Sequence, residues 1–320
     1  MLFRSGISIC DIPFRTKSSP TMTTTYLLTG DIGGTHSRIA LYDISSTIPL
    51  EVKIYRNQDY ITERKDGLFE AKIIAPFLQH CWAVVKGLEP IERVDIVACF
   101  AVAGPVEDNK VQMSNLHDLE IDGHAIARGM YCYETYVERI RVCKIINDFV
   151  AQGFGCLTLQ THEVQELTPE SHKMALSCGP KVCVGAGTGL GECFLTPKGD
   201  GTYSCFPSEG GHVEFNPRSE LEIKLRRYLM NKFGTQHRLS IERVVSGKGL
   251  ANVYEFLTTE FPERVDALVH EEFLEAGDMQ GKVISSNAGD GTLCRQAIDI
   301  MIAYVMTVCC CIHVWRFTVL

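Results

Sequence analysis

The stretch that decides the fold is TGDIGGTHSRIALYD, residues 29–43. An apolar run, residues 26–28, leads into it, and a second apolar run, residues 39–42, lies near its end. The adjacent glycines Gly33 and Gly34 separate the two runs. Two apolar runs joined by a glycine turn predict a β-hairpin, and we take this hairpin as the first element of the fold.

The turn of this hairpin has the composition of a phosphate-binding site. Gly33 and Gly34 let backbone N–H groups approach an anion closely, and the hydroxyls of Thr35 and Ser37 add donors. Asp31 would stand beside the phosphates, where a bare carboxylate repels them. We therefore interpret Asp31 as an indirect ligand of Mg²⁺, which would lie between the carboxylate and the phosphates. The alternative for this stretch alone is an ordinary glycine hairpin with a polar tip.

A second stretch, KVCVGAGTGLGECFL at residues 181–195, repeats the same arrangement. Its turn contains Gly187, Thr188 and Gly189 between two apolar runs, and we predict a second phosphate-binding hairpin there. Neither stretch has the spacing of a Walker A loop or of the dinucleotide fingerprint. Two such hairpins on two lobes predict a nucleotide held across a cleft.

Composition limits the class of protein. A chain of 320 residues with 45% hydrophobic and 22% charged residues is long enough for two globular lobes. The formal net charge of −8 argues against a nucleic-acid partner, which normally requires a basic face. Residues 300–315 lack charged side chains, but the stretch is short for a membrane span and contains His313, so we expect no membrane insertion.

The chain has 14 cysteines, and their spacing contains no C-x-x-C pair. Most of them lie singly within apolar segments, as small core residues of a protein in a reducing compartment do. We therefore expect neither a disulfide framework nor a zinc site, and we predict a cytoplasmic location. The triple cysteine at residues 309–311 is a separate case, because adjacent cysteines suit neither role.

Two further segments place polar side chains where an α/β fold binds ligands. The apolar run at residues 94–102 predicts a buried strand, and residues 142–146 predict another that ends in Asn147 and Asp148. Polar side chains at the carboxyl edge of a sheet favour a binding site, although a helix cap is the alternative.

The segment from Ser208 to Val213 reads SEGGHV, and its two glycines form a turn that can aim Glu209 and His212 at one small ligand. Glu242 lies further on, in IERVVSGKGL. Taken alone, Glu242 is also consistent with a solvated carboxylate at a helix start.

As an ordered set, these motifs resemble the bacterial-type glucokinase family in the version also found in some protists. The resemblance covers roughly residues 26–305 and rests on LTGDIGGTHSRIALYD, AVAGPV, MSN, INDFVAQGFG, VGAGTGLGECFL, EGGHVEF and RLSIERVVSGKGL. It implies an α/β, two-lobed, actin-like (ribonuclease H-like) sugar-kinase fold. It also implies phosphorylation of the 6-hydroxyl of glucose with ATP and Mg²⁺.

The resemblance implies a role for each matched residue. Asp148 corresponds to the general base, and Asp148 with Asn147, Glu209, His212 and Glu242 corresponds to the glucose ligands. The residues that correspond to the two phosphate hairpins are Asp31, Gly33, Gly34, Thr35, Gly187, Thr188 and Gly189.

The resemblance also implies a domain organisation. We expect a leader at residues 1–25, with translation starting at Met1 or Met22, a small lobe at 26–147 and a large lobe at 148–305. Residues 306–320 look anomalous where the family has a glycine-rich segment near the adenosine and a final helix, so we expect a chain truncated at the C-terminus. A homodimer is the default assembly, and a peroxisome-like organelle, the glycosome, is the alternative location.

Three alternative functions stay open at this point. A non-catalytic protein would keep the glucose ligands without using ATP. A related hexose kinase would act on fructose, mannose or an amino sugar. A chaperone-like ATPase of the same fold is least favoured, because the sugar-ligand set would then have no purpose.

Overall fold

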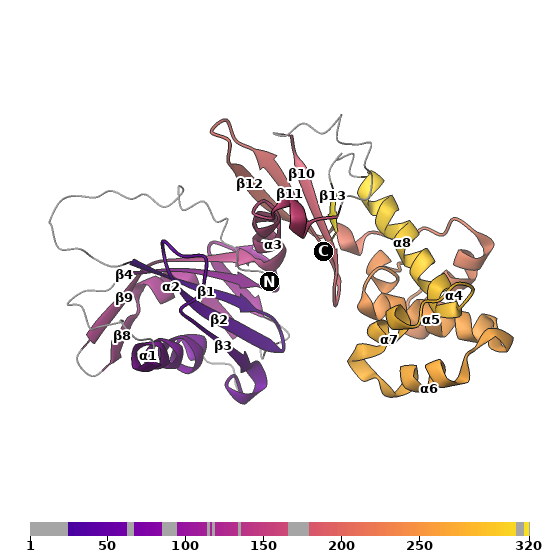
Figure 1. The fold of residues 1–320 in the computed structure, drawn as a ribbon, viewed down its shortest axis with the longest axis horizontal. Coiled ribbons are helices and arrows are strands. Elements are labelled where there is room, and N and C mark those ends of the chain that lie inside the picture. The colour runs from indigo at the N-terminus through magenta and orange to yellow at the C-terminus, as the bar shows by residue number, and fades with distance from the viewer. Residues whose placement is uncertain are drawn as a thin grey trace. The chain divides into compact units, whose positions relative to one another are not determined.

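The computed structural model describes residues 25–62, 67–84, 95–113, 116, 119–133, 136–165, 179–311 and 317–319 (Figure 1). The chain divides into two compact units, residues 1–160 and residues 161–320. This division lies later than the expected lobe boundary after Asn147, because helix α3 (Asp148–Cys156) contacts strands of the first unit. The expected leader falls almost entirely outside the described residues.

The first unit is built on a six-stranded sheet with the order β3-β2-β1-β4-β9-β8. The predicted opening hairpin is confirmed, since the first two strands pair antiparallel from Tyr26 opposite Asp43 to Ile32 opposite Ser37. The buried strand predicted at residues 94–102 is also confirmed, as β4. The bounds are β1 (Thr25–Ile32), β2 (His36–Asp43), β3 (Glu51–Arg56), β4 (Asp95–Val102), β8 (Met130–Tyr133) and β9 (Tyr136–Asn147).

Three central strands of this sheet, β1, β4 and β9, run parallel. Ile32 of β1 lies opposite Val102 of β4, and Val102 lies opposite Asn147 of β9. The carboxyl ends of the three strands therefore meet at one edge of the sheet, which is where open α/β folds bind ligands.

Short elements surround this sheet. Pro76 lies in the first turn of α1, and a π-helical turn, η3, directly precedes this helix. Proline cannot donate to the preceding turn, which is consistent with that irregular hydrogen bonding. A three-stranded sheet of order β5-β6-β7 completes the unit. The bounds are η2 (Asn57–Asp59), η3 (Glu70–Ile74), α1 (Ala75–Val84), β5 (Val106–Glu107), β6 (Lys110–Met113), β7 (Leu119–Asp122) and α2 (Gly123–Arg128).

The second unit contains a four-stranded sheet with the order β12-β11-β10-β13. The predicted second hairpin is confirmed, since β10 and β11 pair antiparallel from Lys181 opposite Leu195 to Ala186 opposite Leu190. Strand β13 pairs in parallel with β10, so part of the stretch expected to be anomalous adds a strand to this sheet. The bounds are β10 (Lys181–Ala186), β11 (Leu190–Pro197), β12 (Tyr203–Ser208) and β13 (Phe317–Val319).

The helices of the second unit pack around one apolar core. Ser219 caps helix α4 at its start, and Gly234, with φ +61°, follows at its end. The last long helix, α8, continues past the expected end at Val305 to Cys311. The bounds are η4 (Thr161–Glu163), η6 (Gly210–His212), α4 (Glu220–Phe233), η7 (Ile241–Arg243), α5 (Gly247–Glu260), η8 (Pro262–Arg264), α6 (Ala267–Glu275), η9 (Gly277–Met279), α7 (Gln280–Ser286) and α8 (Leu293–Cys311).

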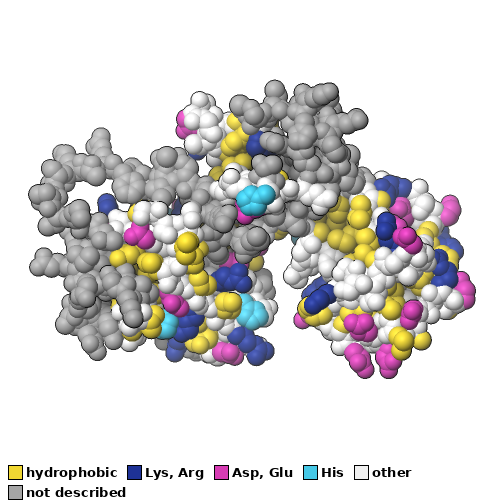
Figure 2. Space-filling model, viewed as in Figure 1, with side chains coloured by type: hydrophobic (Ala, Val, Ile, Leu, Met, Phe, Trp, Pro, Cys, Tyr) yellow, Lys and Arg dark blue, Asp and Glu magenta, His cyan; other side chains and the backbone are white. Residues whose placement is uncertain are grey.

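Charges of both signs are interspersed over the helices of the second unit on the face shown in Figure 2. Several of them form ion pairs, such as Arg226 with Glu214 at 2.9 Å and Arg295 with Asp299 at 2.8 Å. Such exposed pairs contribute about 0–1 kcal/mol each, so they serve solubility more than stability. Within the described part of the chain, no helix combines the length and the apolar character that crossing a membrane requires.

Candidate functional site

In the first unit, Asp31 lies one residue before the end of β1, directly opposite Arg38 on β2. Burial raises the pKa of the Asp31 carboxyl, and the positive charge of Arg38 partly offsets that rise. An acid whose charge is only partly compensated inside the protein favours a cation as an additional partner. Asp31 therefore has the chemistry that the sequence predicts for an indirect Mg²⁺ ligand.

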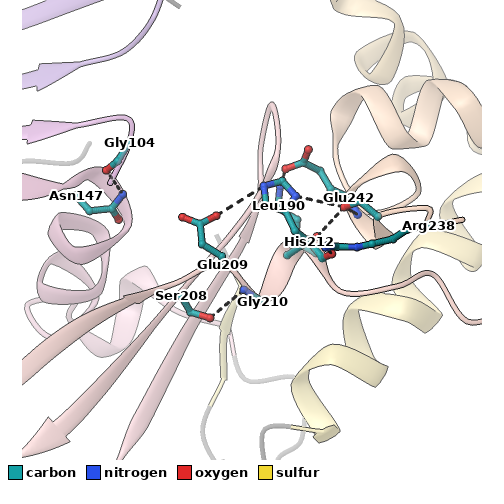
Figure 3. Close-up of polar contacts among 11 residues, drawn as sticks. Gly104, Asn147, Leu190, Ser208, Glu209, Gly210, His212, Arg238 and Glu242 are labelled. Atoms are coloured by element: carbon teal, nitrogen blue, oxygen red, sulfur yellow. Dashed lines mark hydrogen bonds and ion pairs between the residues drawn. The ribbon is translucent and has the colours of Figure 1, made fainter. Parts of the chain in front are cut away.

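Asn147 and Asp148 lie at the same edge, where β9 ends and α3 begins. The Asn147 side chain caps the helix, since its Oδ1 accepts from the N–H groups of Phe149 at 2.9 Å and Val150 at 3.3 Å. Its Nδ2 donates to the carbonyl of Gly104 at 3.1 Å (Figure 3). The helix-cap alternative for Asn147 is thus confirmed, and a hydrogen bond from the same side chain to the Asp148 carboxyl lowers the pKa of that carboxyl.

The carboxyl group of Asp148 lies at the first turn of α3 and is coupled to Asp31. Burial raises its pKa most, and the negative charge of Asp31 raises it further. A hydrogen bond from the Phe149 N–H, 3.0 Å from Oδ1, acts in the opposite direction. The structure therefore brings Asp31 and Asp148 together at one sheet edge, as two interacting acids. A raised pKa suits a carboxylate that must accept a proton near neutral pH.

The turn between β1 and β2 is stabilised by hydrogen bonds with residues of the first unit. The Gly33 N–H donates to the carbonyl of His36 at 2.9 Å, while Thr35 is exposed. Ser37, expected to donate to a phosphate, is instead buried, and its hydroxyl donates to Oδ1 of Asn57 at 2.7 Å. The Gly33 N–H is therefore used within the turn, Gly34 and Thr35 lie at its tip, and Ser37 is part of its support.

The second glycine turn, between β10 and β11, is fixed by backbone bonds at both ends. The Gly187 N–H donates to the carbonyl of Gly189 at 2.9 Å, and the Gly247 N–H at the start of α5 donates to the carbonyl of Gly187 at 2.8 Å. A side chain at Gly187 would meet nothing within 4 Å, and Thr188 is exposed. The tip of this turn is therefore open to a ligand.

Glu242, in the short helix η7, contacts the hairpin that contains this turn. Its Oε2 accepts a hydrogen bond from the Leu190 N–H at 3.0 Å, and a Cβ placed on Gly189 would lie 2.5 Å from the same oxygen (Figure 3). The carboxylate is thus anchored on the hairpin, and it is not the solvated group that the alternative interpretation expects. Its remaining lone pairs can accept from a ligand.

Glu209 directly precedes the short helix η6 and His212 is its last residue, and the two side chains come together as the sequence predicts. Nε2 of His212 lies 3.7 Å from Oε2 of Glu209, and both side chains are well exposed, at 50% and 79%. The glycines between them are required, because a Cβ on Gly211 would lie 1.9 Å from the carbonyl oxygen of Leu190. The turn therefore presents an acid and an imidazole to solvent on a tightly packed backbone.

Ser240 is a residue that sequence reasoning missed. Its Oγ lies 3.3 Å from Nδ1 of His212 and donates to the carbonyl of Gly211 at 3.2 Å. The Glu242 N–H donates to the same Oγ at 3.3 Å. One hydroxyl therefore connects the Glu209–His212 turn to Glu242. A serine two residues before an acid is a capping signal, but it does not reveal the distant histidine.

Glu192 is a second missed residue. It lies on β11 opposite Ser208 and is 3% exposed, and its Oε1 has no hydrogen-bond partner among the described residues. Its Oε2 would lie 2.1 Å from a Cβ on Gly210, so the carboxyl packs directly beneath the Glu209–His212 turn. Burial raises the pKa of this carboxyl, and a hydrogen bond from Ser208 lowers it.

The described part of the chain contains no group of three or more metal-ligating side chains. Mg²⁺ in phosphoryl-transfer sites is commonly held by one or two carboxylates together with the substrate phosphates, so a large protein cage is unnecessary. Asp31 fits that requirement by its oxygen ligand and its place beside Asp148.

Solved structures show the fold. The structure resembles a glucokinase from Balamuthia mandrillaris in complex with glucose, with a TM-score of 0.60 and 17% identity over 93% of this chain and 79% of the other. It also resembles a glucokinase from an Antarctic psychrotroph, with a TM-score of 0.54 and 20% identity over 86% and 74%. The fold is that of a two-lobed, actin-like sugar kinase, as the sequence predicts.

Sequence comparison gives the family within this class. The glucokinase family model matches residues 28–313. A glucokinase from Synechocystis is 36% identical over 280 residues, covering 86% of this chain and 73% of the relative. A glucokinase from Helicobacter acinonychis is 32% identical over 278 residues, covering 85% and 71%. The chain belongs to the glucokinase family.

Proposed function

We propose that this chain transfers the γ-phosphoryl group of ATP to the 6-hydroxyl of glucose, with Asp148 as the general base. Membership of the glucokinase family supports the reaction. The observation that carries the role of Asp148 is its placement. It is a half-buried carboxyl at the carboxyl edge of the parallel strands, and its partial burial, together with the charge of Asp31, raises its pKa.

In this proposal Asp148 accepts the proton of the sugar hydroxyl as that oxygen attacks the γ-phosphorus. Asn147, Glu209, His212 and Glu242 bind the other hydroxyls of glucose. Vicinal hydroxyls each offer a donor and an acceptor, so amides, carboxylates and imidazoles are suitable ligands. An incorrect sugar would leave some of these groups unpaired, which gives strong discrimination.

The two glycine turns bind the phosphates of ATP. Gly33, Gly34 and Thr35 act in the first unit, and Gly187, Thr188 and Gly189 act in the second. Asp31 would hold Mg²⁺ indirectly, and the ion would supply neutralisation of the phosphate charge. Phosphoryl transfer depends mainly on positioning and charge neutralisation, which these groups provide.

The test is glucose-dependent release of ADP by the purified chain, run beside a glucose titration without nucleotide. We expect both turnover and binding. Glucose binding without ADP release would support the non-catalytic alternative, and faster turnover with mannose, fructose or glucosamine would support a related hexose kinase. The proposal also includes a cytoplasmic location, from the cysteine usage, and a homodimer, as the resemblance implies. Light scattering coupled to gel filtration tests the dimer.

A further inference from the structure

Asn57 lies directly after β3, at the start of η2, and its side chain is buried with 1% exposure. It is 24 residues from Gly33 and 20 residues from Ser37 in the sequence, yet it contacts both. A fully buried amide needs partners for its oxygen and nitrogen. In this protein the partners lie on the two sides of the glycine turn between β1 and β2.

Three short hydrogen bonds connect Asn57 to that turn. Its Nδ2 donates to the carbonyl of Gly33 at 2.7 Å, and its Oδ1 accepts from the Ser37 hydroxyl at 2.7 Å. Its backbone N–H donates to the carbonyl of Thr35 at 2.8 Å. Asn57 is itself fixed, because its carbonyl accepts from Tyr60 at 3.0 Å and from Ile61 at 2.7 Å. A rigid amide thus holds the beginning and the end of the turn.

These bonds determine which backbone groups face outward. The carbonyl of Gly33 and the N–H of Gly34 belong to one trans peptide unit, so they point in opposite directions. Because the carbonyl of Gly33 points at Asn57, the N–H of Gly34 points away from it. The same contact keeps a carbonyl oxygen, which would repel a phosphate, on the inner side of the turn.

We propose that Asn57 is a positioning residue for nucleotide binding, which orients the turn between β1 and β2 so that the N–H of Gly34 faces the phosphates of ATP. Asn57 touches no substrate in this account and acts through the backbone it holds. The inference rests on the proposed function, since it requires the turn to bind ATP.

The test compares the wild type with Asn57→Asp, which keeps the side-chain shape but loses the donor to Gly33 and adds a charge. We expect KM for ATP to rise about tenfold or more, because a buried carbonyl loses its partner and the turn loses its orientation. KM for glucose should change by less than about twofold. Ser37→Ala is a milder second variant, which removes one bond to Asn57 and should raise KM for ATP by a few fold.

Asn109→Asp is the matched control, because Asn109 makes the same kind of bonds in the same unit. Its Nδ2 donates to the carbonyl of Cys143 at 2.9 Å, and its Oδ1 accepts from the Ile145 N–H at 2.8 Å. The control should lower the thermal midpoint of unfolding without a selective change in KM for ATP.

Calorimetric titration with MgATP separates the possible results. Wild-type binding of ATP that weakens in Asn57→Asp and Ser37→Ala, with glucose binding intact, supports the inference. Unchanged ATP affinity in both variants overturns the inference alone, as does an equal selective loss in the Asn109 control. A wild-type chain that binds no ATP overturns the proposed function and the inference together.

Discussion

The backbone N–H of Leu190 donates a hydrogen bond of 3.0 Å to Oε2 of Glu242. Leu190 begins β11, directly after the glycine turn proposed to bind phosphates, and Glu242 is a proposed glucose ligand. One carboxylate therefore contacts the strand that follows the proposed phosphate turn and keeps lone pairs for a ligand. A change at this contact should affect both substrates.

Gly189→Ala tests this contact. The added Cβ would lie 2.5 Å from Oε2 of Glu242, so the carboxylate must move and its bond with Leu190 breaks. We expect weaker glucose binding in a calorimetric titration and a stability loss of about 1–3 kcal/mol, typical of overpacking. Gly187→Ala is the control for stability, because its Cβ meets nothing within 4 Å. Equal stability losses in the two variants would contradict the account.

The Glu209–His212 turn gives a prediction about rank order. A Cβ on Gly211 would lie 1.9 Å from the backbone oxygen of Leu190, whereas a Cβ on Gly210 would meet the side chain of Glu192 at 2.1 Å. A side chain can move aside more easily than a strand. Gly211→Ala should therefore reduce glucose affinity and the thermal midpoint more than Gly210→Ala does. The reverse order would show that Glu192 is held as rigidly as the backbone.

The coupling of Asp31 to Asp148 predicts a pH effect. Asp148 must be ionised to accept a proton, so activity falls as the pH drops through its raised pKa. Asp31→Asn removes a negative charge that raises this pKa. In the residual activity of this variant, the acidic limb of the kcat/KM profile should therefore move to lower pH. Asp95→Asn is the control, because Asp95 pairs with Arg141 at the opposite end of β4. An unmoved limb in Asp31→Asn would contradict the coupling.

Glu192 predicts a dependence of stability on pH. Its folded-state pKa is raised by burial, so its contribution is favourable at low pH and is lost as the pH rises through the folded-state value. Glu192→Gln lacks this titration. The free energy of unfolding of the wild type minus that of the variant should therefore increase as the pH falls below neutral. Urea unfolding at several pH values measures this difference in free energy. A difference that stays constant with pH would contradict a raised pKa for Glu192.

The sequence was sufficient to predict the two hairpins, because each combines apolar runs with a glycine turn, a local signal. It was also sufficient to place Asn147 and Asp148 at a sheet edge, since a buried strand ends there. The order of the strands within each sheet depends on pairings between distant segments, and local patterns carry little information about them.

The support of the site was not predictable for the same reason. Asn57 bonds to residues 20 and 24 positions away, and Glu242 bonds to Leu190 over 52 positions. No local motif marks such partners. The buried side chain of Ser37 shows the limit most clearly, because its composition suggests a phosphate donor and its surroundings make it a donor to Asn57.

The most direct test of the account is the turnover of Asp148→Asn, measured as glucose-dependent ADP release beside a glucose titration. The amide keeps the shape and can still hydrogen-bond to the sugar, but it cannot accept the proton. We predict that kcat falls by about 10² to 10⁴ while glucose binding stays within a few fold of the wild type. Turnover near the wild-type rate in a variant that binds glucose normally would contradict the role of Asp148 as the general base.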